Sequence, residues 1–182
     1  MSETIKGTTA FSEILKKVER YYNEKITRYG PTPQGVDWNS EASQKLRFEQ
    51  LLRICDRTSF SINDYGCGYG VLVDYMIEKG YTFEYRGFDL CQKMIDGAKQ
   101  LHQNLSFCQF SSDEDSLVTA DYTVVSGVFN VRPQINDQEW IAYILHTLEI
   151  LARLNVKGFA FNLLTKYAEE DKKRPDLYYA DP

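Results

Sequence analysis

Residues that commonly hold structural metals are scarce in this chain of 182 residues, which has two histidines and four cysteines. Cys55, Cys67, Cys91 and Cys108 form no Cys-x-x-Cys pair and show no other zinc-ligand spacing. With so few candidate ligands, no metal site is expected.

Long apolar runs and an excess of positive charge are also missing. No run approaches the length of a membrane span, and residues 1–17 lack the apolar centre of a signal peptide. We therefore expect a reduced, cytoplasmic protein without a membrane partner. The net charge of −5 disfavours a protein that binds nucleic acid through its phosphates. The compact basic run Lys172-Lys173-Arg174 follows three acidic residues and is interpreted as a solvated segment of mixed charge.

What is present is typical of a globular chain that is most simply one domain, with 43% hydrophobic residues and a surplus of aromatics. From residue 58 onward, short apolar segments alternate with helical patterns. This alternation predicts a doubly wound, mostly parallel α/β sheet with helices on both faces. Strands are expected at residues 60–64, 83–89, 105–110, 122–126 and 156–164.

Two amphipathic helical patterns precede the first strand. One covers residues 11–29, and the other ends near residue 56, with Asn39 or Ser40 suited to cap it. This preface is too short for a separate domain. We expect residues 1–57 to form a helical cap packed on a ligand-binding α/β core of residues 58–182.

The first predicted strand runs into a glycine-rich turn, Asp64-Tyr65-Gly66-Cys67-Gly68-Tyr69-Gly70, and a helical pattern follows. Backbone N–H groups and a helix N-terminus converge on a ligand at such a turn. Glycine is required where the backbone approaches the ligand closely or needs a positive φ. Because ligands of doubly wound sheets lie beyond the carboxyl ends of the strands, this turn marks the expected site.

The glycine spacing indicates the kind of ligand. The dinucleotide fingerprint is G-x-G-x-x-G, whereas the spacing here is G-x-G-x-G and Val71 stands at the place of the third glycine. Asp64 would repel a pyrophosphate but attract an ammonium or sulfonium group. The turn therefore favours a cationic nucleoside without phosphate over a dinucleotide.

The segment from Asp64 to Gly70 resembles motif I of the class I S-adenosylmethionine-dependent methyltransferases, E/D-x-G-x-G-x-G. Asp89 ends the second predicted strand, where that family has an acidic residue that binds both ribose hydroxyls. The resemblance covers about residues 58–165. It implies a Rossmann-like methyltransferase fold with strand order 3-2-1-4-5, S-adenosylmethionine as the methyl donor, and in-line methyl transfer.

The resemblance also implies the residues around the donor. Those predicted to bind it are Asp64, Gly66, Cys67, Gly68, Gly70, Asp89, Leu90, Met94, Ser111 (or Ser112 or Asp113), Ser126, Gly127 and Val128. Candidates for a lid or for acceptor contacts are Trp38, Arg47, Phe129 and Asn130, with packing as the alternative for Trp38 and a surface ion pair for Arg47. No catalytic base is assigned, because the donor supplies most of the reactivity.

One departure from the family concerns the end of the chain. The family's core continues after the fifth strand with a helix and an antiparallel hairpin, for which residues 165–182 are too few. We therefore expect either a truncated chain that lacks the C-terminal strands or a fifth strand left as an edge, which a second copy in a homodimer would cover.

Two classes of nucleic-acid methylase are disfavoured because the chain lacks their sequence motifs. Residues 126–130 lack the Asn/Asp-Pro-Pro-Tyr motif of many nucleic-acid amino methylases, and the chain has no Pro-Cys dipeptide of the cytosine-carbon methylases. The prediction is a methyltransferase acting on a small molecule or a protein side chain. A nicotinamide-dependent oxidoreductase and a non-catalytic S-adenosylmethionine-binding module stay as alternatives.

Overall fold

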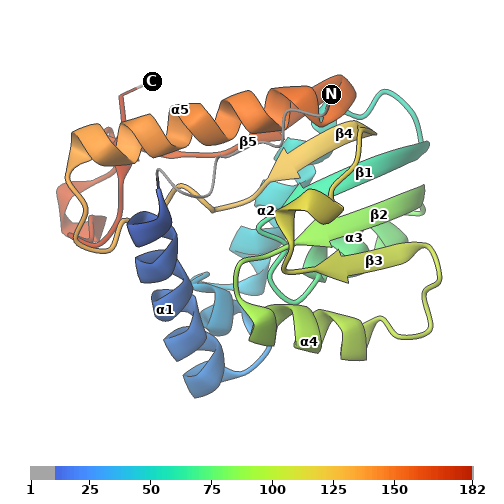
Figure 1. Ribbon diagram of the computed structural model, residues 1–182, viewed down its shortest axis with the longest axis horizontal. Coiled ribbons are helices and arrows are strands. Elements are labelled where there is room, and N and C mark those ends of the chain that lie inside the picture. The colour runs from blue at the N-terminus through green and yellow to red at the C-terminus, as the bar shows by residue number, and fades with distance from the viewer. Residues whose placement is uncertain (1–10, 182) are drawn as a thin grey trace.

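The computed structural model describes residues 11–181, which form a five-stranded sheet with helices on both faces (Figure 1). All neighbouring strands are parallel, and their order is β3-β2-β1-β4-β5. This confirms the predicted fold class and strand order. The strands are β1 (Ser59–Tyr65), β2 (Thr82–Phe88), β3 (Cys108–Ser111), β4 (Ala120–Val125) and β5 (Asn155–Phe161).

Two of the helices, α2 and α5, begin with a capping side chain. Ser40, one of the two predicted caps, accepts a hydrogen bond of 3.1 Å from the backbone N–H of Ser43 at the start of α2. Asn136 caps α5 in the same way through Glu139. The helices are α1 (Ser12–Tyr29), α2 (Glu41–Leu51), α3 (Val71–Glu78), α4 (Gln92–Leu101) and α5 (Asp137–Arg153).

Two expected strands have different bounds. The third begins at Cys108 rather than at residue 105, because residues 102–108 form tight turns in which Leu105 and Cys108 donate to the carbonyls of His102 and Leu105. The fifth ends at Phe161 rather than at residue 164, and Leu164 instead starts the two-residue strand β6 (Leu164–Thr165).

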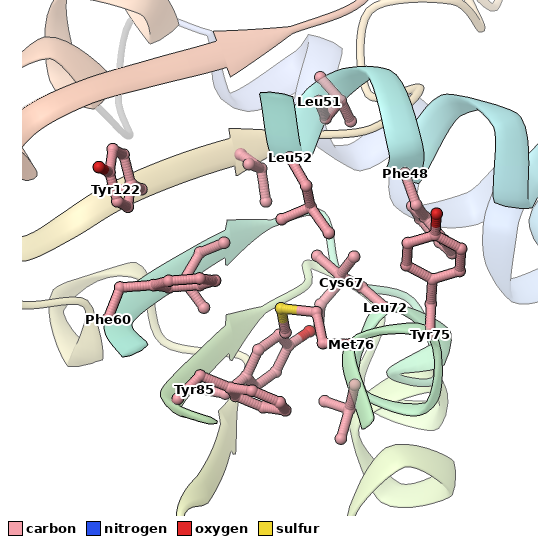
Figure 2. Packing of buried hydrophobic residues seen from close by; sticks show 14 of the residues in the cluster. Phe48, Leu51, Leu52, Phe60, Cys67, Leu72, Tyr75, Met76, Tyr85 and Tyr122 are labelled. Atoms are coloured by element: carbon pink, nitrogen blue, oxygen red, sulfur yellow. The ribbon is translucent and has the colours of Figure 1, made fainter. Parts of the chain in front are cut away.

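A buried cluster fills each face of the sheet, because side chains alternate along a strand. On one face, α2, α3 and α4 cover residues such as Phe60 and Ile62 of β1. Figure 2 shows Phe48 of α2 in this cluster together with Leu52, which directly follows α2, and Leu72 of α3. On the other face, α1 and α5 cover Tyr65 of β1 and Val125 of β4, and α5 contributes Trp140 and Leu151 to this cluster.

The first helix lies beyond the carboxyl ends of the central strands, since the strand arrows in Figure 1 point towards α1. It is anchored by Ile14 and Val18, which are buried in the second cluster. The two helices before β1 therefore contact the core at the end where a ligand is expected. The division of the chain at residue 57 stays a prediction.

Residues after β5 fold back towards this same end. Strand β6 pairs in parallel with β7 (Tyr179–Ala180), and Leu177 forms an antiparallel bridge with Val131. Strand β5 remains an edge of the sheet formed by the described residues. Among the helices of residues 11–181, none combines the length and apolar character that a membrane span requires.

The first prediction concerns the core. Leu72 is 1% exposed, so Leu72→Ala is expected to lower the free energy of unfolding by about 2–5 kcal/mol, through lost burial and a residual cavity. Leu46 is 56% exposed, so Leu46→Ala should change it by about 0.5 kcal/mol or less. Urea denaturation of both variants measures the difference. Equal effects would contradict the packing described here.

Candidate active site

A cavity of about 320 Å³ lies at the carboxyl ends of β1, β2 and β4. Its walls come from α1, from the connection into α2, from the glycine turn, from the ends of β2 and β4, and from the C-terminal segment. The volume is near the lower limit for small-molecule sites. The cavity lies at the switch point of the sheet, since β1 pairs with β2 on one side and β4 on the other.

The glycine turn is bonded to the end of β2. The N–H groups of Gly66 and Cys67 donate to the carbonyl of Phe88 at 2.7 and 2.9 Å. Gly66 and Gly68 have φ values of 82° and 56°, and a Cβ on Gly66 would lie 2.2 Å from Cγ2 of Val128. A side chain at either position would be strained by the positive φ and would press on the side chain of Val128 or Val36, which agrees with the expected need for glycine.

Asp89 is held by two backbone bonds. Its Oδ2 accepts from the N–H of Gly68 and its Oδ1 from the N–H of Cys91, each at 2.9 Å. Burial raises its pKa to about 6, although both hydrogen bonds act in the opposite direction. Each carboxylate oxygen keeps a further lone pair. Asp89 can therefore accept two hydroxyl protons of a vicinal diol in a fixed orientation.

Asp64 is 2% exposed and lines the same cavity. Its Oδ2 accepts from the hydroxyl of Tyr85 at 2.7 Å, whereas Oδ1 has no partner among the described residues. Burial raises its pKa to about 7; the Tyr85 bond opposes this shift, and the charge of Asp89 adds to it. An unsatisfied buried carboxylate oxygen is costly, so this position suits a cationic donor such as an ammonium group.

Trp38 and Arg47 form one stacked pair at the wall. The guanidinium carbon of Arg47 lies 5.3 Å from the centre of the Trp38 ring, and Trp38 packs against Gly127. The surface ion pair considered for Arg47 is wrong. This side chain is half-buried and has no ion-pair partner among residues 11–181, and burial lowers its pKa. Both residues line the cavity.

Most of the predicted donor residues meet at this cavity, although their contact with a donor stays a prediction. Ser126 and Asn130 there have buried side-chain oxygens without a partner among the described residues. The predicted residues that line the cavity are Trp38, Arg47, Asp64, Gly66, Cys67, Gly68, Asp89, Leu90, Met94, Ser126, Gly127, Val128 and Asn130. Gly70 does not line it; this residue precedes α3 and has a φ of 87°.

Two expectations fail on geometry. Phe129 points into the core, where it is 0% exposed between Tyr143 and Phe161, so it is not an acceptor contact. Ser111 and its two alternatives do not line the cavity, and their side chains bond within their own loop or to α4. Ser111 accepts from the N–H of Asp113, and Ser112 donates to Gln92.

Several wall residues gave no signal in the sequence. Arg174 is the clearest case, because it was interpreted as part of a solvated run, yet it lines the cavity and lies 3.1 Å from Asp37. Its neighbours Lys172 and Lys173 do pair with nearby glutamates of the same segment. Other wall residues without such a signal include Val18, Glu19, Asp37, Tyr143, Leu164, Ala168, Leu177 and Tyr179.

Comparison with known proteins decides the family. No protein-family model matches the chain. A protein of Mycobacterium tuberculosis, named as a candidate methyltransferase, is 44% identical over 123 residues, which are 68% of this chain and 74% of that protein. The chain belongs to the class I S-adenosylmethionine-dependent methyltransferases. Its cofactor is therefore S-adenosylmethionine, for which the glycine turn, Asp89 and the unsatisfied oxygen of Asp64 are suited.

More distant methyltransferases agree with this family. The mitochondrial ubiquinone biosynthesis O-methyltransferase of Candida albicans is 26% identical over 136 residues, 71% of this chain but 38% of that enzyme. A mycolic acid cyclopropane synthase crystallised with S-adenosylhomocysteine has a TM-score of 0.60 at 18% identity; the match covers 83% of this chain and 57% of the synthase. The N-methyltransferase NodS of Bradyrhizobium japonicum has a TM-score of 0.56 at 14% identity. This match covers 80% of the present chain and 72% of NodS. These structures show the shared fold.

The second prediction concerns Asp89. Asp89→Asn removes the charge and directs an amide group at the N–H of Gly68 or Cys91, so affinity for S-adenosylhomocysteine should fall by about tenfold or more. Titration calorimetry measures the dissociation constant. Asp96→Asn, on the exposed face of α4, is the matched control and should bind as the wild type does. Unchanged affinity in Asp89→Asn would contradict the assigned role.

The third prediction concerns pH. Protonated Asp64 carries no charge to pair with an ammonium group, so affinity for S-adenosylhomocysteine should rise as the pH increases through about 7. Asp64→Asn should weaken binding at about pH 8 and remove most of this rise. Asp89, with a pKa of about 6, contributes at lower pH. Calorimetry over this range is the measurement, and an equally steep rise in Asp64→Asn would exclude Asp64 as its source.

Proposed function

We propose that this chain transfers the methyl group of S-adenosylmethionine to a small molecule with an aromatic or apolar body. The observation that carries the proposal is a single cavity with two unlike sides. Asp64, Asp89 and the glycine turn form a polar side suited to the donor. Facing residues from α1, α5 and the C-terminal segment supply aromatic and apolar walls that include Tyr22, Tyr143 and Leu177.

The polar side has candidate partners for the ribose of the donor and for both charged groups of its amino-acid end. Asp89 would accept the ribose hydroxyls, and Oδ1 of Asp64 would accept from the ammonium of the amino-acid end. The guanidinium of Arg47 has no anionic partner of its own among residues 11–181 and would pair with the carboxylate. When bound, S-adenosylmethionine supplies an electrophilic methyl group on its sulfonium.

The chain's contribution is alignment and exclusion of water. Aromatic walls bind a flat acceptor with little loss of side-chain entropy. Burial raises the pKa of Tyr143 to about 12 and that of Tyr22 further, so neither phenol ionises near neutral pH. We therefore assign these residues to binding and no residue to the role of a base.

Relatives support a small acceptor over the alternatives. The name of the Candida albicans relative describes O-methylation in ubiquinone biosynthesis, which is chemistry on a small molecule. No comparison favours a nicotinamide-dependent oxidoreductase or a non-catalytic binding module. A cytoplasmic location and pairing of two copies along the β5 edge belong to the same proposal, and light scattering of the purified chain tests the pairing.

The test of this function is release of S-adenosylhomocysteine from S-adenosylmethionine in the presence of acceptor panels. Phenols, aliphatic alcohols and amines form the small-molecule panels, and unstructured peptides form the alternative. Turnover that requires a small acceptor supports the proposal. Turnover only with peptides, or binding of the donor without turnover on any panel, would contradict it.

The fourth prediction concerns Arg47. Arg47→Gln should weaken S-adenosylhomocysteine by about tenfold, because the carboxylate loses a charged partner in a half-buried site. The matched ligand is 5′-methylthioadenosine, which lacks the amino-acid end and should bind both proteins equally. Calorimetry gives both dissociation constants. An equal loss for both ligands would show that Arg47 shapes the wall, and no loss for either would assign it to the acceptor side.

A further inference from the structure

The C-terminal segment, residues 164–180, closes one side of the cavity. Its backbone is tied to the loop after β4, since the N–H of Arg132 donates to Asp176 and the N–H of Tyr178 donates to Asn130, both at 2.8 Å. Figure 1 shows this segment in red beside α1. Residues that it contributes to the wall are Leu164, Ala168, Lys172, Arg174, Leu177 and Tyr179.

Arg174 fastens this segment to the first helix and to the loop before α2. Its Nη2 donates to the hydroxyl of Tyr21 at 3.0 Å and lies 3.1 Å from Oδ2 of Asp37. Its Nε donates to Oδ1 of Asp176 at 3.0 Å. Asp37 also accepts from Tyr21 at 3.0 Å and from Lys25 at 2.6 Å. Three segments that are distant in the sequence therefore meet in one network.

The network is electrically balanced. Lys25 and Arg174 carry two positive charges, and Asp37 and Asp176 carry two negative ones. The side chain of Asp37 is only 9% exposed, so loss of one charge would leave its partner uncompensated in a poorly solvated place. The hydrogen bonds with Asp176, then Asp37 and Tyr21, raise the pKa of Arg174 against the effect of burial, which keeps it charged. A balanced wall offers no net attraction to an anion.

We propose that Arg174 is a positioning residue whose balanced network with Asp37 holds the C-terminal segment as the acceptor wall and selects neutral aromatic acceptors over anionic ones. This inference rests on the proposed function, because it assigns the acceptor side of the same cavity. Apolar and aromatic surfaces of Leu177, Tyr179 and Tyr22 would contact the acceptor body.

Binding of a matched pair of probes tests the proposal without turnover. Protein loaded with S-adenosylhomocysteine is titrated with catechol and with 3,4-dihydroxybenzoate, which differ by one carboxylate. The wild type is expected to prefer catechol. Asp37→Asn leaves one positive charge in excess. The ratio of the dissociation constants of the two probes should therefore change by about fivefold in favour of 3,4-dihydroxybenzoate. Asp37 has a φ of 61°, a conformation that asparagine tolerates, so the backbone should be kept.

Two substitutions of Arg174 separate its charge from its geometry. Arg174→Gln leaves one negative charge in excess and should move the ratio about fivefold further towards catechol. Arg174→Lys keeps the charge and should leave the ratio near that of the wild type, but it cannot make all the bonds of the guanidinium fork. Hydrogen exchange at the N–H of Tyr178 should therefore be faster in both variants. Lys16→Gln, in an exposed pair with Glu13 away from the cavity wall, is the control for charge alone.

The outcomes are separable. A probe ratio that is equal in all variants, or that moves as much in Lys16→Gln, would overturn the selectivity of this wall. Binding of S-adenosylhomocysteine without either probe would overturn its role as the acceptor wall and leave the donor site intact. Failure of the wild type to bind S-adenosylhomocysteine would contradict the proposed function and this inference together.

Discussion

The site depends on the bonds between the glycine turn and the end of β2. The carbonyl of Phe88 accepts from Gly66 and Cys67, and Asp89 accepts from Gly68, so the turn and the second strand hold each other in place. The position of Asp89 therefore follows from the conformation of the turn. Since the turn tolerates no side chain at Gly66, one backbone geometry determines both the space for a donor and the carboxylate that would bind it.

Negative charge is concentrated on one side of the cavity, where Asp64 is buried, Asp89 is half-buried, and both have raised pKa values. Two carboxylates in poor contact with water are costly without a partner. A ligand that brings an ammonium group and hydroxyl protons would recover part of this cost. Arg47 is the complementary case on α2, a half-buried cation without a carboxylate partner among the described residues. The uncompensated carboxylate of Asp64 and guanidinium of Arg47 thus complement the ammonium and carboxylate groups at the amino-acid end of the proposed donor.

Local pattern predicted the parts of this structure that depend on short stretches of chain. The alternation of strands and helices, the positive φ values in the turn and the cap at Ser40 all have causes within a few residues. Phe129 was misjudged because the end of a strand does not reveal the face to which a side chain points. Ser111 was misjudged because its hydroxyl bonds within its own loop. Both depend on neighbours that are distant in the sequence or on fine loop geometry.

By itself the sequence determined the fold class, the strand order implied by the motif and the donor class, because the glycine spacing and two acidic strand ends are local and chemically specific. Tertiary structure alone brought together the residues of the proposed acceptor side. Arg174 ends a segment of mixed charge that is typical of a solvated surface, and only folding brings it within 3.1 Å of Asp37, 137 positions earlier in the chain. An ion pair over such a separation leaves no periodic trace in the sequence, since it depends on how the segment after β5 returns across the site.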